Sequence, residues 1–325
     1  MLRVGIVGFG SIGSQHARVI DSHANLDLVG IADIKVSRIL DKFRAKFYDS
    51  IDELIRLKPD YVVIATPTIT HTEIADFFLS KRIGVLIEKP ISNSFDSALT
   101  LISRAGDDCF ARVGHIERFN SASIEAKRLI TSGQIGKVIS VSTFRHSPLP
   151  NRIQDVGVIL DLATHDIDLV QWMVNSEYRE CIGQTKTLTS HSSESLLYSM
   201  GELLNGCLVT HSVNWISPYK KRSLTILGEI GTLEVDLLHS EVTLLRSTID
   251  PVKHPALTSV LGGVGSESSK LSFQIDEPLM LEHSAVFETF TQGDSALCTL
   301  AEGARVVDIA SHLARGLEYK PRKLQ

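Results

Sequence analysis

Short apolar runs alternate with stretches of helical periodicity in the first third of the chain. Apolar residues recur at helical spacing in Ser14–Ser22, Ile51–Leu57 and Thr72–Leu79. The apolar runs that we expect to form strands are Leu2–Val7, Leu28–Ala32, Tyr61–Ala65, Val85–Ile87 and Cys109–Val113. This alternation predicts an α/β fold with a parallel, doubly wound sheet and right-handed crossovers. Ligands bind such a sheet at the carboxyl ends of its strands.

The pattern changes after residue 120. Helices are expected at Ala122–Thr131 and from Asp161 to Val174, with a strand at Val138–Arg145 between them. From about Thr187 onward, short polar turns separate a series of expected strands: Leu196–Leu203, Cys207–Trp215, Leu224–Leu227, Thr232–Leu237 and Val242–Leu245. This spacing is typical of an antiparallel meander. Residues 250–275 are rich in Pro, Ser and Gly and are expected to form a loop. Two helices, near Glu282–Thr291 and Ala301–Arg315, are expected to follow.

A glycine motif follows the first expected strand. Its residues are Gly8, Phe9, Gly10, Ser11, Ile12 and Gly13. In this pattern the first glycine permits a tight turn, the second lets a pyrophosphate approach the backbone, and the third lets the next helix pack closely on the sheet. The phosphates would lie at the positive N-terminus of that helix. The sequence therefore predicts a dinucleotide site formed by Gly8, Gly10, Ser11, Ile12 and Gly13.

An acidic residue stands where the ribose of the dinucleotide would bind. Asp33 follows the second apolar run and lies twenty residues beyond Gly13. Its carboxylate would accept hydrogen bonds from the adenosine ribose and repel a 2′-phosphate, so we expect NAD to be preferred over NADP. The turns that follow two later strands carry further candidate cofactor-binding residues, namely Thr66, Pro67, His71, Glu88 and Lys89. For His71, a role at the start of a helix is the more common reading.

Length and charge limit the possible classes of protein. A chain of 325 residues suggests two domains. We place a Rossmann domain at residues 1–120 and an α/β domain for substrate binding and oligomerisation at 121–325, and leave open whether the last helices pack back on the first domain. The net charge of −5 gives no basic footprint for nucleic acid. We expect no membrane segment and a cytoplasmic location, with four reduced cysteines. The histidine spacing predicts no metal site.

Four motifs together resemble those of the glucose-fructose oxidoreductase, inositol dehydrogenase and MocA family. They are Gly8–Gly13, Ala65-Thr66-Pro67, Glu88-Lys89-Pro90 and Asp161-Leu162-Ala163-Thr164-His165-Asp166. The resemblance extends along almost the full chain. It implies an N-terminal Rossmann domain and a C-terminal domain with an open, mostly antiparallel sheet, which commonly forms oligomer contacts. Because the expected strands after residue 187 are apolar on both faces, we expect a homodimer or homotetramer.

The candidate catalytic residues are Lys89, His165 and Asp161. Oxidation of a sugar hydroxyl needs a base for its proton while hydride leaves for the nicotinamide. Asp161 and His165 are four residues apart and would share a helix face. Asp161 could therefore hold the substrate or orient the imidazole. The family resemblance implies that Lys89 and His165 flank the reacting carbon and that His165 accepts the proton, while Lys89 polarises the oxygen.

The segment Gly114-His115-Ile116-Glu117-Arg118-Phe119-Asn120 resembles one found in family members that are UDP-N-acetylglucosamine 3-dehydrogenases. Arg118 could bind a phosphate or carboxylate through its planar guanidinium, or it could pair with Glu117 or a helix terminus. We include Arg118 and Asn120, with Lys89, Asp161 and His165, among the candidate substrate-binding residues.

The sequence thus predicts an NAD(H)-dependent oxidoreductase that acts on a sugar hydroxyl or ketone. The favoured substrate is a nucleotide-linked hexose, which would react at C3. An inositol or free-sugar dehydrogenase is the alternative within the same class of enzyme. A non-catalytic NAD-binding sensor on the same scaffold is the alternative from another class, and the presence of both Lys89 and His165 argues against it.

Overall fold

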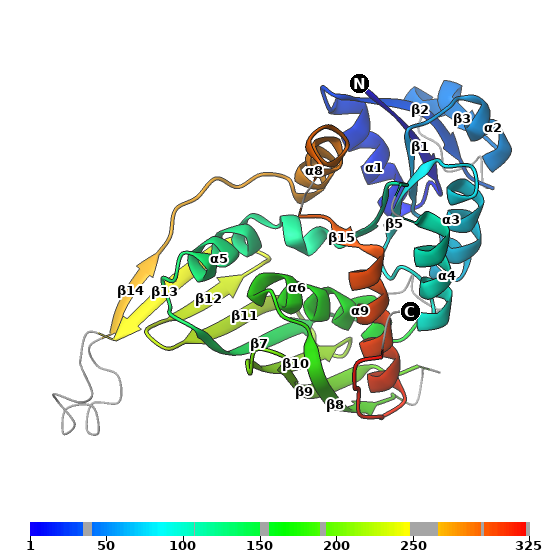
Figure 1. Ribbon diagram of the computed structural model, residues 1–325. Coiled ribbons are helices and arrows are strands. Elements are labelled where there is room, and N and C mark those ends of the chain that lie inside the picture. Colours follow the sequence, from blue (N-terminus) through cyan, green and yellow to red (C-terminus); the bar gives the residue numbers. More distant parts are fainter. Residues whose placement is uncertain are drawn as a thin grey trace, which may run out of the picture. The chain divides into compact units, whose positions relative to one another are not determined.

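The computed structural model describes residues 1–34, 41–106, 108–149, 156–188, 193–247, 266–293 and 296–322. The chain forms two compact units (Figure 1). The first comprises Met1–Phe119 and Glu277–Ser311, and the second comprises Asn120–Asp276 and His312–Arg322. The segment that follows the second unit's sheet therefore returns to the first unit.

The first unit is built on a sheet with the strand order β15-β6-β5-β4-β1-β2-β3. Its parallel strands are β1 (Leu2–Val7), β2 (Leu26–Ala32), β3 (Phe47–Tyr48), β4 (Tyr61–Ile64), β5 (Gly84–Glu88) and β6 (Ala111–Gly114). The short strand β15 (Cys298–Thr299) pairs antiparallel with β6. The order of β1–β6 is that of a Rossmann sheet, in which the chain reverses direction across the sheet between β1 and β4. This reversal defines the switch point where a ligand binds.

Helices cover both faces of this sheet. They are α1 (Ser11–Ser22), α2 (Ile51–Arg56), α3 (His71–Leu79), α4 (Phe95–Ala105), α8 (Pro278–Gln292) and α9 (Leu300–Ala314), with short 3₁₀ helices at Asp41–Lys46, Thr68–Thr70 and Ile116–Phe119. Every residue of β4 is buried. Tyr61 and Val63 pack in the core that includes residues of α1 and α8, whereas Val62 and Ile64 pack in the core that includes α3 and α4. Burial on both faces explains why these strands read as continuous apolar runs.

The second unit contains a sheet with the order β14-β13-β12-β11-β7-β10-β9-β8. Its strands are β7 (Val138–His146), β8 (Tyr178–Lys186), β9 (Leu196–Leu203), β10 (Leu208–Asn214), β11 (Lys221–Gly228), β12 (Thr232–Asp236), β13 (Glu241–Ser247) and β14 (Ser266–Lys270). β7 and β10 are parallel, and the other paired strands are antiparallel. The predicted fold class, a Rossmann unit followed by a mostly antiparallel sheet, is therefore confirmed.

Two strands of this sheet were not expected from the sequence. β8 lies before the predicted meander, and β14 lies within the segment 250–275 that was predicted to be a loop; residues 248–265 of that region are outside the described residues. Arg179, Glu180 and Gly183 interrupt the apolar pattern of β8. β14 has the sequence SESSK and no apolar residue, so only its pairing with β13 makes it a strand.

The helices of the second unit lie over one face of its sheet. α5 (Ser121–Thr131) contacts β12 and β13, and α6 (Thr164–Val174) contacts β7 (Figure 1). Along β9, buried Leu197 and Ser199 alternate with Tyr198 and Met200, which are 58% and 57% exposed. Met200 pairs with Ile182 of β8, which is also exposed. The other face therefore carries apolar side chains in contact with solvent.

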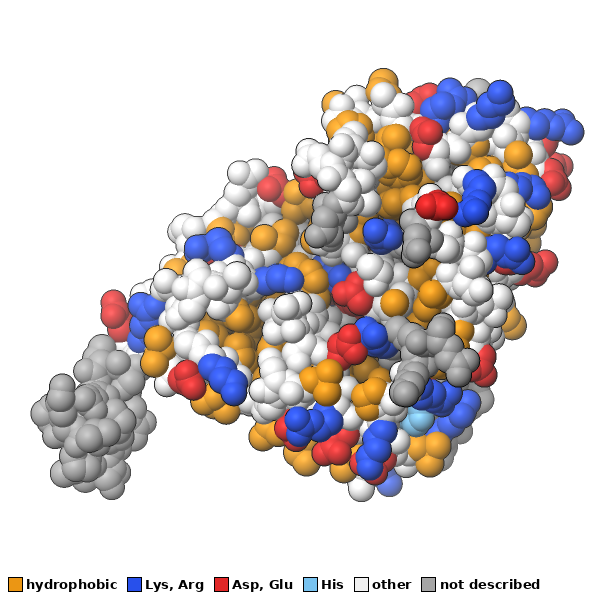
Figure 2. Space-filling model, in the orientation of Figure 1, with side chains coloured by type: hydrophobic (Ala, Val, Ile, Leu, Met, Phe, Trp, Pro, Cys, Tyr) orange, Lys and Arg blue, Asp and Glu red, His pale blue; other side chains and the backbone are white. Residues whose placement is uncertain are grey.

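Charges of both signs lie on the described surface (Figure 2). On the face drawn in Figure 2, Lys and Arg side chains are interspersed with Asp and Glu, in line with the net charge of −5. Within the described ranges, no helix has both the length and the apolarity needed to cross a lipid bilayer.

Candidate cofactor site and catalytic residues

The glycine turn fixes the switch point through backbone contacts. The Gly8 N–H donates to the Ala32 carbonyl at the end of β2, at 2.8 Å. Gly8 has a φ of +94°, and a Cβ there would lie 2.7 Å from the Ala65 carbonyl oxygen. A Cβ on Gly13 would lie 1.9 Å from the Gly8 carbonyl oxygen. Both positions therefore need glycine because the turn, β4 and α1 approach one another closely.

Gly10 has a different requirement. Its φ of −75° is open to any residue, and a Cβ there would have no atom within 4 Å. The protein itself therefore gives no steric reason for glycine at this position. Ser11 and Ile12, in the first turn of α1, are exposed. This open space before the N-terminus of α1 fits the approach of a pyrophosphate to the backbone.

Asp33 lies beside the same turn. Its Oδ2 accepts a hydrogen bond from the backbone N–H of Phe9 at 2.6 Å. Three exposed isoleucines follow the carboxyl ends of β1, β2 and β4: Ile12 at 43%, Ile34 at 89% and Ile69 at 72% exposed. Parallel strands place their carboxyl ends at one edge of a sheet. Apolar side chains along this edge fit the flat rings of a dinucleotide, which would remove them from water.

His71 connects the two turns that were predicted to border the cofactor. Its Nε2 lies 2.9 Å from the Thr66 carbonyl, and its Nδ1 lies 2.9 Å from the Pro90 carbonyl. The side chain is 1% exposed, and burial lowers the pKa of His71. These two hydrogen bonds hold the turns together at the start of α3. Contact of His71 with the cofactor stays a prediction. Thr66 also accepts a hydrogen bond from Thr70 at 2.8 Å.

Glu88 and Lys89 stand at the end of β5. The Glu88 carboxylate accepts from His16 Nε2 of α1 at 2.8 Å. Burial raises the pKa of Glu88, but the hydrogen bond and the charge of His16 outweigh it and bring the pKa below its ordinary value. Glu88 is therefore an anchored carboxylate inside the first unit, and partly buried Lys89 is the next residue along the chain.

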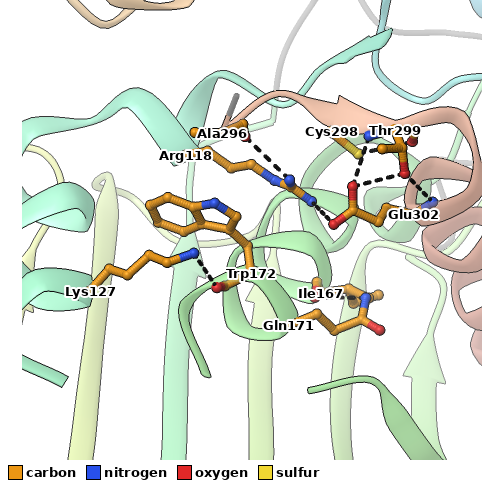
Figure 3. Close-up of polar contacts among 9 residues, drawn as sticks. All are labelled: Arg118, Lys127, Ile167, Gln171, Trp172, Ala296, Cys298, Thr299 and Glu302. Atoms are coloured by element: carbon orange, nitrogen blue, oxygen red, sulfur yellow. Dashed lines mark hydrogen bonds and ion pairs between the residues drawn. The ribbon is translucent and has the colours of Figure 1, made fainter. Parts of the chain in front are cut away.

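Arg118 and Asn120 have structural partners. Arg118 is 3% exposed, and its guanidinium contacts Glu302 Oε1 at 3.3 Å and the Ala296 carbonyl at 3.4 Å (Figure 3). Glu302 also accepts from Thr299 N–H at 2.8 Å, which caps α9. Asn120 caps α5 by accepting from Ala122 N–H, and it donates to the Leu237 carbonyl. The acidic partner that the structure shows for Arg118 is Glu302, at the start of α9. Substrate contact by Arg118 or Asn120 stays a prediction.

In the second unit, Asp161 and His165 flank a change in helix type. Ile159–Ala163 form a π-helical turn, which passes into α6 at Thr164. Such turns occur often at functional sites because they alter the direction of side chains. Both residues are partly exposed. The predicted helix is thus present, but its first turn is a π-helical turn, which is wider than an α-helical turn. The prediction that Asp161 and His165 share a helix face assumed a regular α-helix.

Buried contacts hold α6 in place. Arg145 Nε of β7 donates to Asp166 Oδ1 at 2.8 Å, and the two side chains are only 2% and 3% exposed. On α5, Lys127 Nζ donates to the Trp172 carbonyl at 2.8 Å and lies 3.9 Å from the centre of the Trp172 ring (Figure 3). The helix that carries His165 is therefore fixed to both its sheet and its neighbouring helix.

Family models match both units of the chain. Residues 2–110 match the model described as an oxidoreductase family with an NAD-binding Rossmann fold, and residues 124–234 match the GFO/IDH/MocA C-terminal domain. The chain belongs to the GFO/IDH/MocA family. The family resemblance predicted from the four motifs is confirmed, and so is the NAD-binding domain.

Individual members of the family match at lower identity. The chain is 30% identical to an inositol 2-dehydrogenase of Acidothermus cellulolyticus over 189 residues, 55% of each chain. It is 29% identical to the UDP-N-acetylglucosamine 3-dehydrogenase of Acidithiobacillus ferrooxidans over 180 residues, 54% of this chain and 55% of that one. The chain thus spans about half the length of these curated relatives. The solved structure of GnnA, a UDP-N-acetylglucosamine 3-dehydrogenase of that organism, has a TM-score of 0.85 at 22% identity, with 97% of both chains covered.

Two residues that contact the candidate site residues were not predicted from the sequence. His16 binds Glu88 across 72 positions, and Glu302 contacts Arg118 from a distant helix. His16 follows Gly13 by three positions, so its presence on α1 could be foreseen from the glycine motif. Its partner could not, because the packing of α1 against β5 decides it.

Proposed function

We propose that this protein is an NAD(H)-dependent oxidoreductase that transfers hydride between the nicotinamide and a sugar hydroxyl or ketone. The observation that carries the proposal is the open space at Gly10, beside Asp33 and at the switch point of a Rossmann sheet. Nothing inside the protein requires glycine at that position, whereas an approaching pyrophosphate does. Asp33 supports NAD over NADP because its carboxylate would repel a 2′-phosphate.

The proposed catalytic roles follow from the chemistry of alcohol oxidation. When bound, NAD supplies the hydride acceptor. His165 takes the hydroxyl proton as general base, and Lys89 favours alkoxide character on the oxygen through its positive charge. Asp161 holds the substrate or orients the imidazole. The roles come from the family motifs, and the exposure of Asp161 and His165 at the π-helical turn is compatible with them.

For the substrate, we propose a nucleotide-linked hexose that is oxidised at C3. Support comes from the segment Gly114–Asn120 and from the UDP-N-acetylglucosamine 3-dehydrogenase relative. Arg118 gives this substrate little support, because Glu302 already pairs with its charge. Exposed Lys220 and partly buried Lys221, at the start of β11, could meet a diphosphate instead.

A cyclitol dehydrogenase is the second candidate function. The inositol 2-dehydrogenase relatives favour it, since one of them aligns at 27% identity over 257 residues, 75% of each chain. The two functions differ in whether the substrate carries a nucleotide.

A substrate screen tests the proposal. The protein and NAD are mixed with UDP- and dTDP-hexoses, inositols and free hexoses, and the absorbance of NADH is followed. Reduction of NAD by UDP-N-acetylglucosamine or a close relative is the expected result. Strong activity on myo-inositol or free glucose, with none on any nucleotide sugar, would overturn the substrate assignment and leave the oxidoreductase class intact.

A further inference from the structure

A chain of buried polar side chains runs through the first unit. Tyr61 Oη of β4 lies 3.1 Å from His283 Nδ1 of α8, and His283 Nε2 lies 2.9 Å from His16 Nδ1 of α1. His16 Nε2 then lies 2.8 Å from Glu88 Oε1. Tyr61, His16 and His283 have no exposed surface. Three fully buried side chains therefore join β4, α8 and α1 to Glu88 at the end of β5, where the Glu88 side chain is 16% exposed.

The end of this series at Glu88 has a defined hydrogen-bond direction. An ionised Glu88 can only accept, so His16 must donate through Nε2–H. Burial lowers the pKa of His283 well below its ordinary range, so its ring is neutral and carries one hydrogen. That hydrogen lies either on Nε2, towards His16, or on Nδ1, towards the Tyr61 hydroxyl. In both arrangements His16 donates to Glu88.

Glu282, the residue before His283, takes no part in this series of hydrogen bonds. Its side chain has no exposed surface, and neither carboxyl oxygen has a hydrogen-bond partner among the described residues. One of its oxygens lies within 4.8 Å of both His16 and Glu88. An ionised carboxylate buried without a donor, beside a second carboxylate, would be strongly unfavourable.

We propose that Glu282 is a neutral carboxylic acid that shares its proton with the Glu88 carboxylate, so that the pair carries one negative charge and Glu88 is fixed at the end of β5. The separation allows a hydrogen bond after a small side-chain rotation, or through one buried water. Burial, followed by the charge of Glu88, raises the pKa of Glu282 well above its ordinary value of 4.5. Glu282 is thus a positioning residue for the turn that carries Lys89.

A proton fits this cluster better than a metal ion. Two ligand atoms on one zinc ion lie roughly 3.3 Å apart, given zinc–ligand distances of about 2.0–2.2 Å. His16 Nε2 and Glu88 Oε1 are closer than that, at 2.8 Å, and the direction of the chain puts a hydrogen between them. The titratable groups that face Glu282 or its partners are His16, His23, Asp60, Tyr61, Glu88, Lys89 and His283.

Infrared spectroscopy of the full-length protein tests the charge state directly. Near pH 7, exposed carboxyl groups are ionised, so a carbonyl stretch of a protonated acid reports a buried one. We expect this band in the wild-type protein and in E288Q, a control at an exposed position of the same helix, but not in E282Q. Absence of the band from the wild type, or its persistence in E282Q, would overturn the proposal, as would a stoichiometric metal ion that E282Q fails to retain.

The pH dependence of stability gives a second readout. A carboxyl group whose pKa is raised by folding binds more protons in the native state, so stability falls as pH rises above 4.5. Thermal unfolding should show E282Q gaining stability relative to the wild type over that range, while E288Q follows the wild type. Parallel curves for all three proteins would contradict a neutral Glu282. A titration of the wild-type infrared band gives the same answer if E282Q does not fold.

The positioning role depends on the proposed function, because its readout is NAD binding. E282L removes the proton donor from Glu88, a candidate cofactor-binding residue, and should raise the dissociation constant for NAD by about tenfold, the loss of one hydrogen bond. E282Q keeps a neutral donor and should recover most of that affinity. Equal losses in E282Q and E282L would refute the role of the shared proton. If the wild type does not bind NAD, the proposed function fails, while the infrared result still decides the state of Glu282.

Discussion

The two glycines Gly10 and Gly13 should respond to the same substitution in opposite ways. For Gly10→Ala, the φ of −75° and the open surroundings permit a methyl group. Restricting the unfolded chain would stabilise the protein by about 0.4–1 kcal/mol. Replacing Gly by Ala at the N-cap of α1 opposes this by up to about 1 kcal/mol. The two effects nearly cancel, so the stability of this variant should stay within about 1 kcal/mol of the wild type.

The affinity of Gly10→Ala for NAD should nevertheless fall. The methyl group would occupy the space through which the pyrophosphate approaches the N-terminus of α1. Loss of one hydrogen bond to a charged group costs about 1.5–3 kcal/mol, which raises the dissociation constant about ten- to hundredfold. Gly13→Ala places a Cβ 1.9 Å from the Gly8 carbonyl, so α1 must move and stability should fall by at least about 1–3 kcal/mol.

Thermal unfolding and calorimetric titration with NAD separate these effects. The expected result is a stable Gly10→Ala protein with weak binding and a destabilised Gly13→Ala protein. A Gly10→Ala variant that binds NAD like the wild type would refute the assignment of the open space to the pyrophosphate.

Further predictions concern the other parts of the molecule. Asp33→Ser should reduce the preference for NAD in the ratio of catalytic efficiencies with NAD and NADP; an unchanged ratio would remove Asp33 from cofactor selection. Lys89→Ala and His165→Ala should each lower turnover about 10²–10⁴-fold while NAD binding persists, and near-normal turnover of either would disprove its role. Asp166→Ala should lower the free energy of unfolding by about 3–5 kcal/mol in denaturant titrations, because its arginine partner on β7 stays buried; a loss below 1 kcal/mol would contradict this. Met200→Glu should convert a dimer or tetramer to monomers in light scattering, since Met200 lies on the exposed sheet face; a wild-type monomer at micromolar concentration would end the oligomer proposal.

Much of the fold was predictable because the sequence patterns are local. The strands of the Rossmann sheet are apolar on both faces, and β9 was placed at Leu196–Leu203, as found, from its regular alternation. β8 was missed because it is half exposed and carries charges. The π-helical turn before His165 was missed because the spacing of Asp161 and His165 suits an ordinary helix equally well.

The candidate site was less predictable because its partners are distant in sequence. His16 and His283 are separated by 267 positions, and no local pattern at either residue indicates the other. Arg118 illustrates the same limit. Its side chain is equally suited to an anionic ligand and to a carboxylate of the protein, and only the packing of α9 brings Glu302 to it.

Transfer of a labelled hydride tests the central claim most directly. The protein is incubated with NAD and UDP-N-acetylglucosamine that carries deuterium at C3, and in parallel with the same sugar labelled at C4. We expect mass spectrometry to detect deuterium in NADH from the C3-labelled substrate alone. Reduction of NAD by myo-inositol, with no deuterium transfer from either nucleotide sugar, would contradict the proposed substrate. If no sugar or cyclitol reduces NAD, the proposed oxidoreductase activity is contradicted.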